Sequence, residues 1–373
     1  MISKFDHRIL LFQGGGALGA YQAGVYEGLA EAGMTPNWVV GISIGAVNSA
    51  LIAGNPPERR VERLRAFWDL VSSYAPLSVP AWLDPIRPAL NLLSAGTVAT
   101  FGIQGFFVPR ALSPFFAQDG SPDALSFYDI APLKRTLEEL VDFDLINRHE
   151  MRLSLGAVNV RTSASVYFDN QRSYIGPDHV LASGALPPGF SPVTIDGESY
   201  WDGSVLSNSP LWYVFDTEAR LRSAFVLAVD LFNPQGELPR NLDQVLERAM
   251  DIQYASKRRY TNDRIREVAE LFAALRRVLS KLPPELNDDP DVQKLAPFTR
   301  DRDVTLIHLL NQHRSVSSRT KFYEFSRATV NEAWAAGLND VRHYVAKVGS
   351  TPPTAELGLG VCVYEFPSTF PFN

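Results

Sequence analysis

The fold of this 373-residue chain is indicated by residues 7–54, which read HRILLFQGGGALGAYQAGVYEGLAEAGMTPNWVVGISIGAVNSALIAG. Two short apolar runs within this stretch, residues 9–12 and residues 38–40, have the composition of buried parallel strands. Each run ends at glycines and continues into a segment whose apolar residues recur with helical spacing. Consecutive strand–helix units of this kind predict a parallel sheet.

The same alternation of strand and helix continues through the first two thirds of the chain. A third helix is predicted over residues 59–74, and apolar runs at residues 153–160 and 224–231 predict further buried strands. We therefore expect an α/β fold in which a mainly parallel central sheet is flanked by helices on both faces. This part of the chain is predicted to form one domain over residues 7–232.

The sequence changes after a turn-forming NPQG at residues 233–236. Helices predicted over residues 243–282 and 317–348 flank one predicted strand at residues 304–310. We expect residues 240–373 to form a mostly helical C-terminal extension that packs on the first domain.

The composition excludes several classes of protein. Hydrophobic residues make up 46% and charged residues 20% of the chain, as in ordinary globular domains and unlike a disordered chain or a coiled coil. The net charge of −6 disfavours nucleic acid as a partner. The single cysteine, Cys362, cannot form an internal disulfide, so we expect the cytoplasm, with peripheral contact at a membrane left open. Neither a metal nor a cofactor is expected.

The sequence GISIG at residues 41–45 lies where a predicted strand turns into a helix. In that setting Gly-x-Ser-x-Gly forms a nucleophile elbow, a strained turn that exposes the serine hydroxyl at the end of the strand. The positive end of the helix dipole then lies beside the hydroxyl. Ser43 is therefore the candidate nucleophile, with Gly41 and Gly45 making room for the turn. A tight turn without chemistry is the alternative.

Gly14, Gly15 and Gly16 open the neighbouring strand–helix unit. Consecutive glycines let backbone N–H groups converge on an anion, and beside a serine nucleophile that anion is the oxyanion of acyl transfer. The spacing Gly14-x-Gly16-x-x-Gly19 also matches the dinucleotide-binding pattern. That pattern needs an acidic residue after the second strand, and residues 32–57 contain no Asp or Glu, so nucleotide binding is disfavoured.

A serine nucleophile needs a base, and the best candidate is Asp202. It follows a predicted hairpin whose two-residue turn is Asp196-Gly197, and Gly203 after it permits a turn that leaves the carboxylate uncrowded. An aspartate within hydrogen-bond reach can accept the serine proton directly, although a second turn residue is the structural alternative. The other candidate bases are six histidines, none in a compact motif: His7, His149, His179, His308, His313 and His343.

Several ordered blocks together resemble the patatin-like phospholipase family. They are QGGGALG at residues 13–19, GISIG at 41–45, ASGALPPGF at 182–190, Asp202-Gly203, and NSP at 208–210. The resemblance covers about residues 7–215 and implies a three-layer α/β fold with a Ser–Asp dyad. The C-terminal third resembles an extension attached to a group of bacterial patatin-like proteins.

This resemblance implies roles for individual residues. Ser43 is the expected nucleophile and Asp202 the expected base. Two positions depart from the family pattern: Leu18 stands where an arginine is common, which puts anion or substrate handling in doubt, and Ser204 replaces the usual glycine or alanine without disturbing the assignment. The expected oxyanion donors are the backbone N–H groups of Gly14, Gly15, Gly16 and Ile44.

The implied activity is that of a cofactor-independent serine acyl hydrolase. It cleaves carboxylic esters of lipids, as phospholipases A and lysophospholipases do, through an acyl-enzyme. Three alternatives stay open at this point. They are a Ser-His-Asp esterase, an acyltransferase in which another acceptor intercepts the acyl-enzyme, and a non-enzymatic lipid-binding module.

Two segments are candidates for contact with lipid. The first contains the large apolar residues within residues 77–122, which form either an acyl-binding insertion or lid or part of the ordinary core. Residues 88–109 in this segment are uncharged but too polar for a membrane span. The second segment is a basic amphipathic helix predicted over residues 256–282, with eight basic and three acidic residues, hence +5. It either docks on anionic headgroups or packs on its own domain, and packing is favoured. Candidates in the first segment are Trp82, Leu92, Leu93, Phe101, Phe106, Phe107, Phe115 and Phe116.

Overall fold

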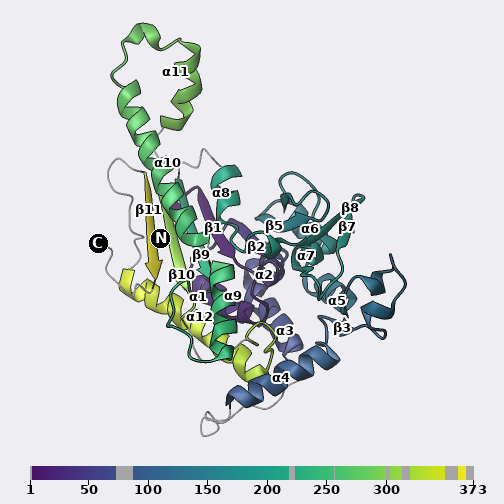
Figure 1. Ribbon diagram of the computed structural model, residues 1–373. Helices are drawn as coiled ribbons and strands as arrows, with labels where there is room; N and C mark the ends of the chain where they lie inside the picture. The colour runs from purple at the N-terminus through teal and green to yellow at the C-terminus, as the bar shows by residue number, and fades with distance from the viewer. Residues whose placement is uncertain are drawn as a thin grey trace.

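The computed structural model describes residues 2–72, 87–217, 223–255, 257–299, 303–312, 320–348 and 360–366. Trp82 and His313, named above as candidates, lie outside these residues. Within them the chain forms a nine-stranded sheet with helices on both faces, and a separate two-stranded ribbon (Figure 1).

The strands and helices follow in chain order. The sheet contains β1 (His7–Phe12), β2 (Trp38–Ile42), β5 (Arg152–Asn159), β6 (Ser165–Asp169), β7 (Val193–Ile195), β8 (Glu198–Asp202), β9 (Ser223–Asp230), β10 (Asp303–Leu310) and β11 (Val361–Phe366). The ribbon consists of β3 (Val108–Pro109) and β4 (Tyr128–Asp129). The helices are α1 (Gly19–Glu31), α2 (Ile44–Ala53), α3 (Arg60–Val71), α4 (Arg87–Phe101), α5 (Ala131–Leu140), α6 (Phe143–Asn147), α7 (Pro177–Gly184), α8 (Leu211–Thr217), α9 (Leu242–Ala255), α10 (Lys257–Leu279), α11 (Pro290–Leu295) and α12 (Arg327–Val348).

The sheet has the strand order β11-β10-β9-β1-β2-β5-β8-β7, and β6 also pairs with β5. Every neighbouring pair from β11 to β5 is parallel, whereas β6, β7 and β8 are antiparallel additions. The prediction of a mainly parallel central sheet flanked by helices is confirmed. The expected hairpin is present as β7 and β8, with Asp196 and Gly197 at φ 51° and 82° in its turn.

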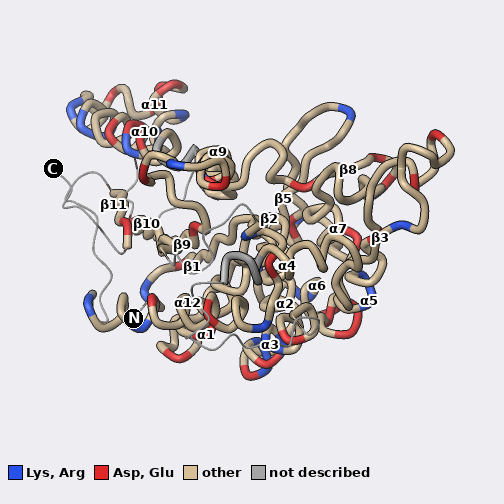
Figure 2. The backbone as a smooth tube through the Cα atoms, turned by 60° about the horizontal axis from the view of Figure 1, so that its bottom comes forward, with Lys and Arg blue, Asp and Glu red and all other residues tan. Residues whose placement is uncertain are grey.

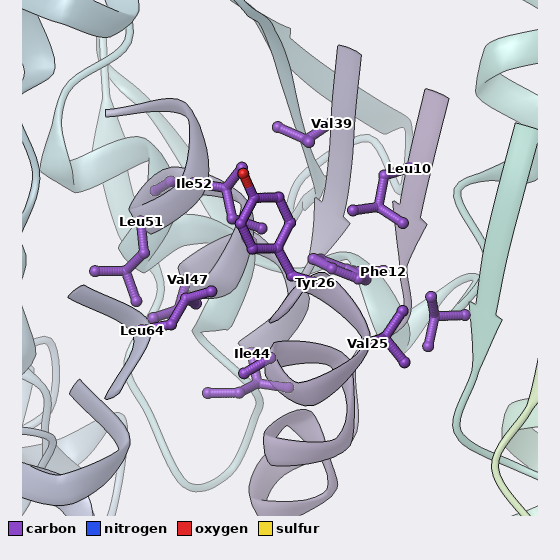
Figure 3. Close-up of a cluster of buried hydrophobic side chains, with 14 of the residues drawn as sticks. Leu10, Phe12, Val25, Tyr26, Val39, Ile44, Val47, Leu51, Ile52 and Leu64 are labelled. Carbon is purple, nitrogen blue, oxygen red and sulfur yellow. The ribbon is translucent and has the colours of Figure 1, made fainter. Parts of the chain in front are cut away.

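Alternate residues of the central strands point to opposite faces of the sheet and enter two apolar layers. Leu10 and Phe12 of β1 point to the face covered by α1, α2 and α12, where apolar side chains of α1 and α2 surround them (Figure 3). Ile9 and Leu11 point to the opposite face, which α8 and α10 cover and where Ile265 of α10 packs. Because both faces are covered, the central strands are continuous apolar runs.

The C-terminal region extends the same sheet. β10 pairs with β9, and β11 pairs with β10. The sequence analysis predicted β10 but not β11, in which only Cys362 and Phe366 are buried. The helix expected from residue 317 begins only at Arg327, after an irregular segment over residues 320–326.

α10 begins on the sheet, and its C-terminal part forms with α11 an arm that extends away from the rest of the molecule (Figure 1). Phe272 of α10 stacks on Phe298 with ring centroids 5.4 Å apart. Basic and acidic residues both occur along the arm (Figure 2). The apolar side chains along one face of α10 are buried or half-buried. Their burial agrees with packing of this amphipathic helix on the protein itself. Within the described residues, no helix combines the length and hydropathy needed to cross a bilayer. The stripe predicted from the sequence is buried or half-buried at all its positions: Ile265, Val268, Phe272, Leu275 and Leu279.

Helices α1 and α12 pack closely where each carries a glycine. A Cβ atom at Gly24 would lie 1.9 Å from the carbonyl oxygen of Trp334. A Cβ atom at Gly337 would lie 2.1 Å from the carbonyl oxygen of Tyr21. Both obstacles are backbone atoms, which cannot turn aside as a side chain can, so this approach of the two helices requires glycine.

Gly337→Ala is expected to lower the free energy of unfolding by about 2–3 kcal/mol, because the added methyl group forces α12 away from α1. Gly96 is the matched control, an exposed helical glycine in α4 with open space around its Cβ position. Gly96→Ala is expected to raise the free energy of unfolding by about 0.5–1 kcal/mol. Urea unfolding followed by circular dichroism measures both, and equal midpoints for the two variants would contradict the contact described.

Candidate active site

The turn after β2 holds Ser43 in a strained backbone conformation. Ser43 has φ 58° and ψ −127°, values that residues other than glycine rarely adopt. A Cβ atom at Gly41 would lie 2.2 Å from the carbonyl oxygen of Gly45, and one at Gly45 would lie 2.6 Å from that of Phe12. These close approaches give the turn the geometry of a nucleophile elbow, with a partly exposed Ser43 at the N-terminus of α2.

A second serine clamps this turn. The Ser43 N–H lies 3.0 Å from the carbonyl oxygen and 3.1 Å from Oγ of Ser183, which is fully buried in α7. Oγ of Ser183 in turn donates to the carbonyl oxygen of Gly156 at 2.6 Å. Ser183 belongs to the block at residues 182–190 that carried the family resemblance. Its contact with the elbow was missed because 140 positions separate the two serines in the sequence.

The sheet register brings Asp202 to the same place as Ser43. Ile42, the last residue of β2, pairs with Gly156 of β5, and Asp202, the last residue of β8, pairs with the next residue, Ala157. Because β6 occupies the other edge of β5 along these residues, β2 and β8 share one edge. Their ends therefore meet, and Ser43 and Asp202 lie at the junction.

The Asp202 side chain is fully buried, with Oδ1 accepting from the Ser204 N–H at 2.8 Å. Oδ2 has no hydrogen-bond partner among the described residues. Burial raises the pKa of Asp202 to about 6, while the Ser43 hydroxyl, and after it Ser204, oppose this rise by stabilising the charged form. The Ser43 hydroxyl thus acts on the carboxylate without hydrogen-bond geometry, as is common before substrate binds. A buried carboxylate with a free oxygen beside a serine suits a general base.

The glycine loop lies against Ser43, since a Cβ atom at Gly14 would be 2.8 Å from Cβ of Ser43. The Gly14 N–H donates to Oδ1 of Asn208 at 2.9 Å, and Nδ2 of Asn208 donates back to the carbonyl oxygen of Gly14 at 3.0 Å. The Gly14 N–H, expected as an oxyanion donor, therefore already has an acceptor. Three of the expected donors make no hydrogen bond to any described residue: the N–H groups of Gly15, Gly16 and Ile44.

A family model described as patatin-like phospholipase matches residues 10–215, more than half of the chain. The chain belongs to the patatin-like phospholipase family of enzymes. A second model, described as patatin phospholipase (DUF3734), matches residues 252–354, so the C-terminal region also resembles a known extension. The comparison with curated proteins finds no match.

Several solved structures match the chain at low sequence identity. VipD from Legionella pneumophila is 14% identical with a TM-score of 0.39, and the match covers 91% of this chain and 67% of VipD. The type III effector ExoU is 12% identical with a TM-score of 0.36, over 93% of this chain and 54% of ExoU. Full-length ExoU in complex with SpcU, from Pseudomonas aeruginosa, is 17% identical with a TM-score of 0.28, and the match covers 78% of this chain and 60% of that chain. This chain therefore spans about half to two thirds of their length.

In this patatin-like protein the C-terminal region lies directly on the glycine loop. Gly16 has φ 55°, and a Cβ atom there would lie 2.3 Å from the carbonyl oxygen of Phe322. That carbonyl oxygen accepts from the Ala17 N–H at 3.0 Å. The Phe322 ring packs on those of Phe232 and Tyr254, with centroids 5.4 and 5.2 Å away. Sequence reasoning did not single out Phe322, because nothing local distinguishes it from a core aromatic residue.

A polar pocket of about 80 Å³ lies between the turn after Asp202 and α9. Ser204 and Asn208 line it together with Tyr254, and none of its lining residues carries a charge. Burial, and after it the nearby Asp202 carboxylate, raises the pKa of the Tyr254 phenol. The pocket therefore lies close to the candidate base, and its chemistry suits a neutral polar group.

None of the histidines in the described part of the chain forms a hydrogen bond with Ser43. His308 is buried, with Nδ1 2.7 Å from Oδ2 of Asp230 and Nε2 3.0 Å from Oδ1 of Asn262. It therefore belongs to a separate network. Nor do the described residues hold a group of three or more His, Cys, Asp or Glu side chains placed to bind a metal ion.

The apolar window expected to handle acyl chains divides between core and surface. Phe107 is buried, and the half-buried Phe106 contacts the rings of Phe67 and Phe325. These two phenylalanines therefore belong to the core. The remaining described candidates present apolar surface to solvent. The exposed residues are Leu92, Leu93, Phe101, Phe115 and Phe116.

Asp202→Asn is expected to raise the free energy of unfolding at pH 8 by up to about 3 kcal/mol. The pKa of about 6 in the folded protein lies above the ordinary 3.8, so the folded state binds the proton more tightly. The stabilising contribution of the protonated form is complete only below the ordinary pKa of 3.8 and is lost as the pH rises through 6. Asparagine avoids that loss, and its advantage should be small at pH 4.

Urea unfolding of both proteins at pH 4 and pH 8 measures this difference. Asp196→Asn, at the exposed hairpin turn, is the control and is expected to change stability little at either pH. A gain for Asp202→Asn that is equal at both pH values would contradict the raised pKa.

Proposed function

We propose that the protein is a serine acyl hydrolase that cleaves carboxylic esters of lipids through Ser43 and Asp202. The observation that carries the proposal is the junction of β2 and β8 on one edge of β5. At this junction a strained serine lies beside a buried carboxylate whose Oδ2 has no hydrogen-bond partner in the described chain. Membership of the patatin-like phospholipase family supports lipid esters as the substrate class.

The proposed reaction has two steps, and in each step Asp202 accepts a proton and then returns it. Oγ of Ser43 attacks the ester carbonyl carbon while Oδ2 of Asp202 accepts the hydroxyl proton. The tetrahedral oxyanion binds to the free N–H groups, and its collapse breaks the ester bond as Asp202 returns the proton to the leaving alcohol. Water then attacks the acyl-enzyme, again giving a proton to Asp202, and the fatty acid leaves as Ser43 recovers its proton. The N–H groups proposed for the oxyanion are those of Gly15, Gly16 and Ile44.

The surface around residues 92–116 supports contact with a lipid phase. Phe115 and Phe116 are 83% and 80% exposed, and Leu93 and Phe101 are exposed nearby in the sequence. Phe115 contacts the exposed Phe127, with ring centroids 6.1 Å apart, and adjoining exposed aromatic rings of this kind suit contact with a protein, a ligand or a membrane. We propose peripheral contact with a membrane surface at this segment, which delivers lipid esters to Ser43.

Ser43→Ala is expected to lower ester hydrolysis by at least about 1,000-fold, because the nucleophile is lost while the elbow remains. The measurements are turnover of p-nitrophenyl butyrate and labelling by a fluorophosphonate probe. Ser49→Ala is the matched control, since Ser49 lies buried in the following helix and its hydroxyl makes no hydrogen bond among the described residues. Normal turnover or labelling in Ser43→Ala would sink the assignment, and labelling absent even in the wild type would favour a lipid-binding module.

The value of kcat/KM is expected to fall about tenfold for each pH unit below pH 6, because protonated Asp202 cannot accept the Ser43 proton. The profile should level above pH 7, since the pKa of Asp202 is about 6. A pH series with p-nitrophenyl butyrate, at a temperature where the fold is intact throughout, provides the measurement. A flat profile between pH 5 and pH 8 would rule out Asp202 as the base.

A further inference from the structure

Four buried polar side chains form a continuous chain at the carboxyl ends of β1, β9 and β10. Nε2 of Gln13 donates to Oδ1 of Asp230 at 3.0 Å, and Oδ2 of Asp230 lies 2.7 Å from Nδ1 of His308. Nε2 of His308 lies 3.0 Å from Oδ1 of Asn262. All four side chains are buried, and none is used in the reaction proposed above. We refer to Gln13, Asp230, His308 and Asn262 as the polar chain.

The sheet register explains why these side chains meet. His308 of β10 is paired two residues before the position of Asp230 in β9, so both side chains point to the same face. Gln13 continues β1 beside Asp230. α10 covers this face and adds Asn262. The polar chain therefore links the C-terminal region, through α10 and β10, to the end of the first strand.

Gln13 immediately precedes the glycine loop and is held through its side chain and its carbonyl oxygen. Its Oε1 accepts from the Leu231 N–H at 3.0 Å, while its Nε2 is used by Asp230. Its carbonyl oxygen accepts from Nε2 of Gln22 at 2.7 Å. Because the side chain and the carbonyl oxygen of Gln13 are both hydrogen-bonded, the backbone enters Gly14 in one direction. That direction sets where the N–H groups of the loop point.

The other end of the loop is held by the same C-terminal region. The carbonyl oxygen of Phe322 accepts from the Ala17 N–H and lies against Gly16, whose positive φ turns the chain at this point. Residues 14–16 thus run between two anchors. Phe322 itself belongs to the C-terminal region, and Gln13 is connected to that region through Asp230 and His308. Displacing oxyanion donors by as little as 1 Å costs a large factor in rate, so anchors of this kind bear on catalysis.

We propose that the polar chain is the device by which the C-terminal region holds the glycine loop in its oxyanion-binding conformation. Asp230 and His308 act as positioning residues through Gln13 and touch no reacting atom. The region matched by the second family model thereby has a role in the active site. The test by ester turnover rests on the proposed function. The test by hydrogen exchange measures the order of the glycine loop and does not depend on that function.

His308→Ala removes the central link of the polar chain. We expect kcat for p-nitrophenyl butyrate to fall about tenfold while KM changes less than about twofold, because misplaced donors weaken only transition-state binding. His308→Gln places an amide between Asp230 and Asn262, and it should recover part of the lost kcat.

Leu306→Ala is the matched control. Leu306 is fully buried on the same strand and face, two residues earlier, and its truncation lowers stability without touching the polar chain. All variants are assayed well below their unfolding temperatures. A loss of kcat in His308→Ala that Leu306→Ala does not share supports the proposal. Equal kcat values in the two variants would overturn it.

Hydrogen exchange at the amides of residues 14–18 supplies the second readout. Exchange should be faster in His308→Ala and Asn262→Ala than in the wild type, and unchanged in Leu306→Ala. If the wild type hydrolyses no ester and this difference is still seen, the proposed function fails and the positioning role stands. If the wild type is active and neither kcat nor exchange separates His308→Ala from Leu306→Ala, the positioning role alone fails.

Discussion

The burial of the Asp202 carboxylate at the end of β8 is the constraint on which the site depends. Taking a carboxylate out of water costs several kcal/mol unless charges or hydrogen bonds compensate, and here the Ser204 N–H and the Ser43 hydroxyl compensate only in part. The group stays in place because the backbone of β8 is paired with β5 and the Asp202 N–H donates to Ala185. The sheet thus maintains a carboxylate that is poorly solvated and therefore basic enough to take a proton near neutral pH.

Ser43 is held in an unfavourable state by the same part of the sheet. Its positive φ persists because the flanking glycines admit the backbone of β1 and α2, and because Ser183 binds its N–H. A strained serine and a desolvated carboxylate would each relax if the surroundings were loose. Both are attached to neighbouring positions of β5, so one rigid strand supports the two destabilised groups.

Much of the fold followed from local patterns. The first two strand–helix units, the hairpin before Asp202 and β10 were predicted close to their observed bounds, since apolar runs, glycines and turn residues act within a few positions. β11 was missed although residues 361–364 form a short apolar run, because its place beside β10 depends on a pairing between segments that are far apart in the chain. The start of α12 was placed too early, since residues 320–326 form an irregular segment against the glycine loop.

The sequence by itself determined the local signals on which the proposed chemistry rests: a serine between glycines after a buried strand, a glycine loop after another, and an aspartate after a hairpin. These signals are local, because strain and turn formation depend on neighbouring residues. Only the tertiary structure decided how the pieces meet. It brought β8 to the edge of β5 that β2 also uses, engaged the Gly14 N–H with Asn208, and tied His308 to Asp230 rather than to Ser43. Such contacts join residues far apart in the chain, and the register and packing that set them are properties of the whole sheet.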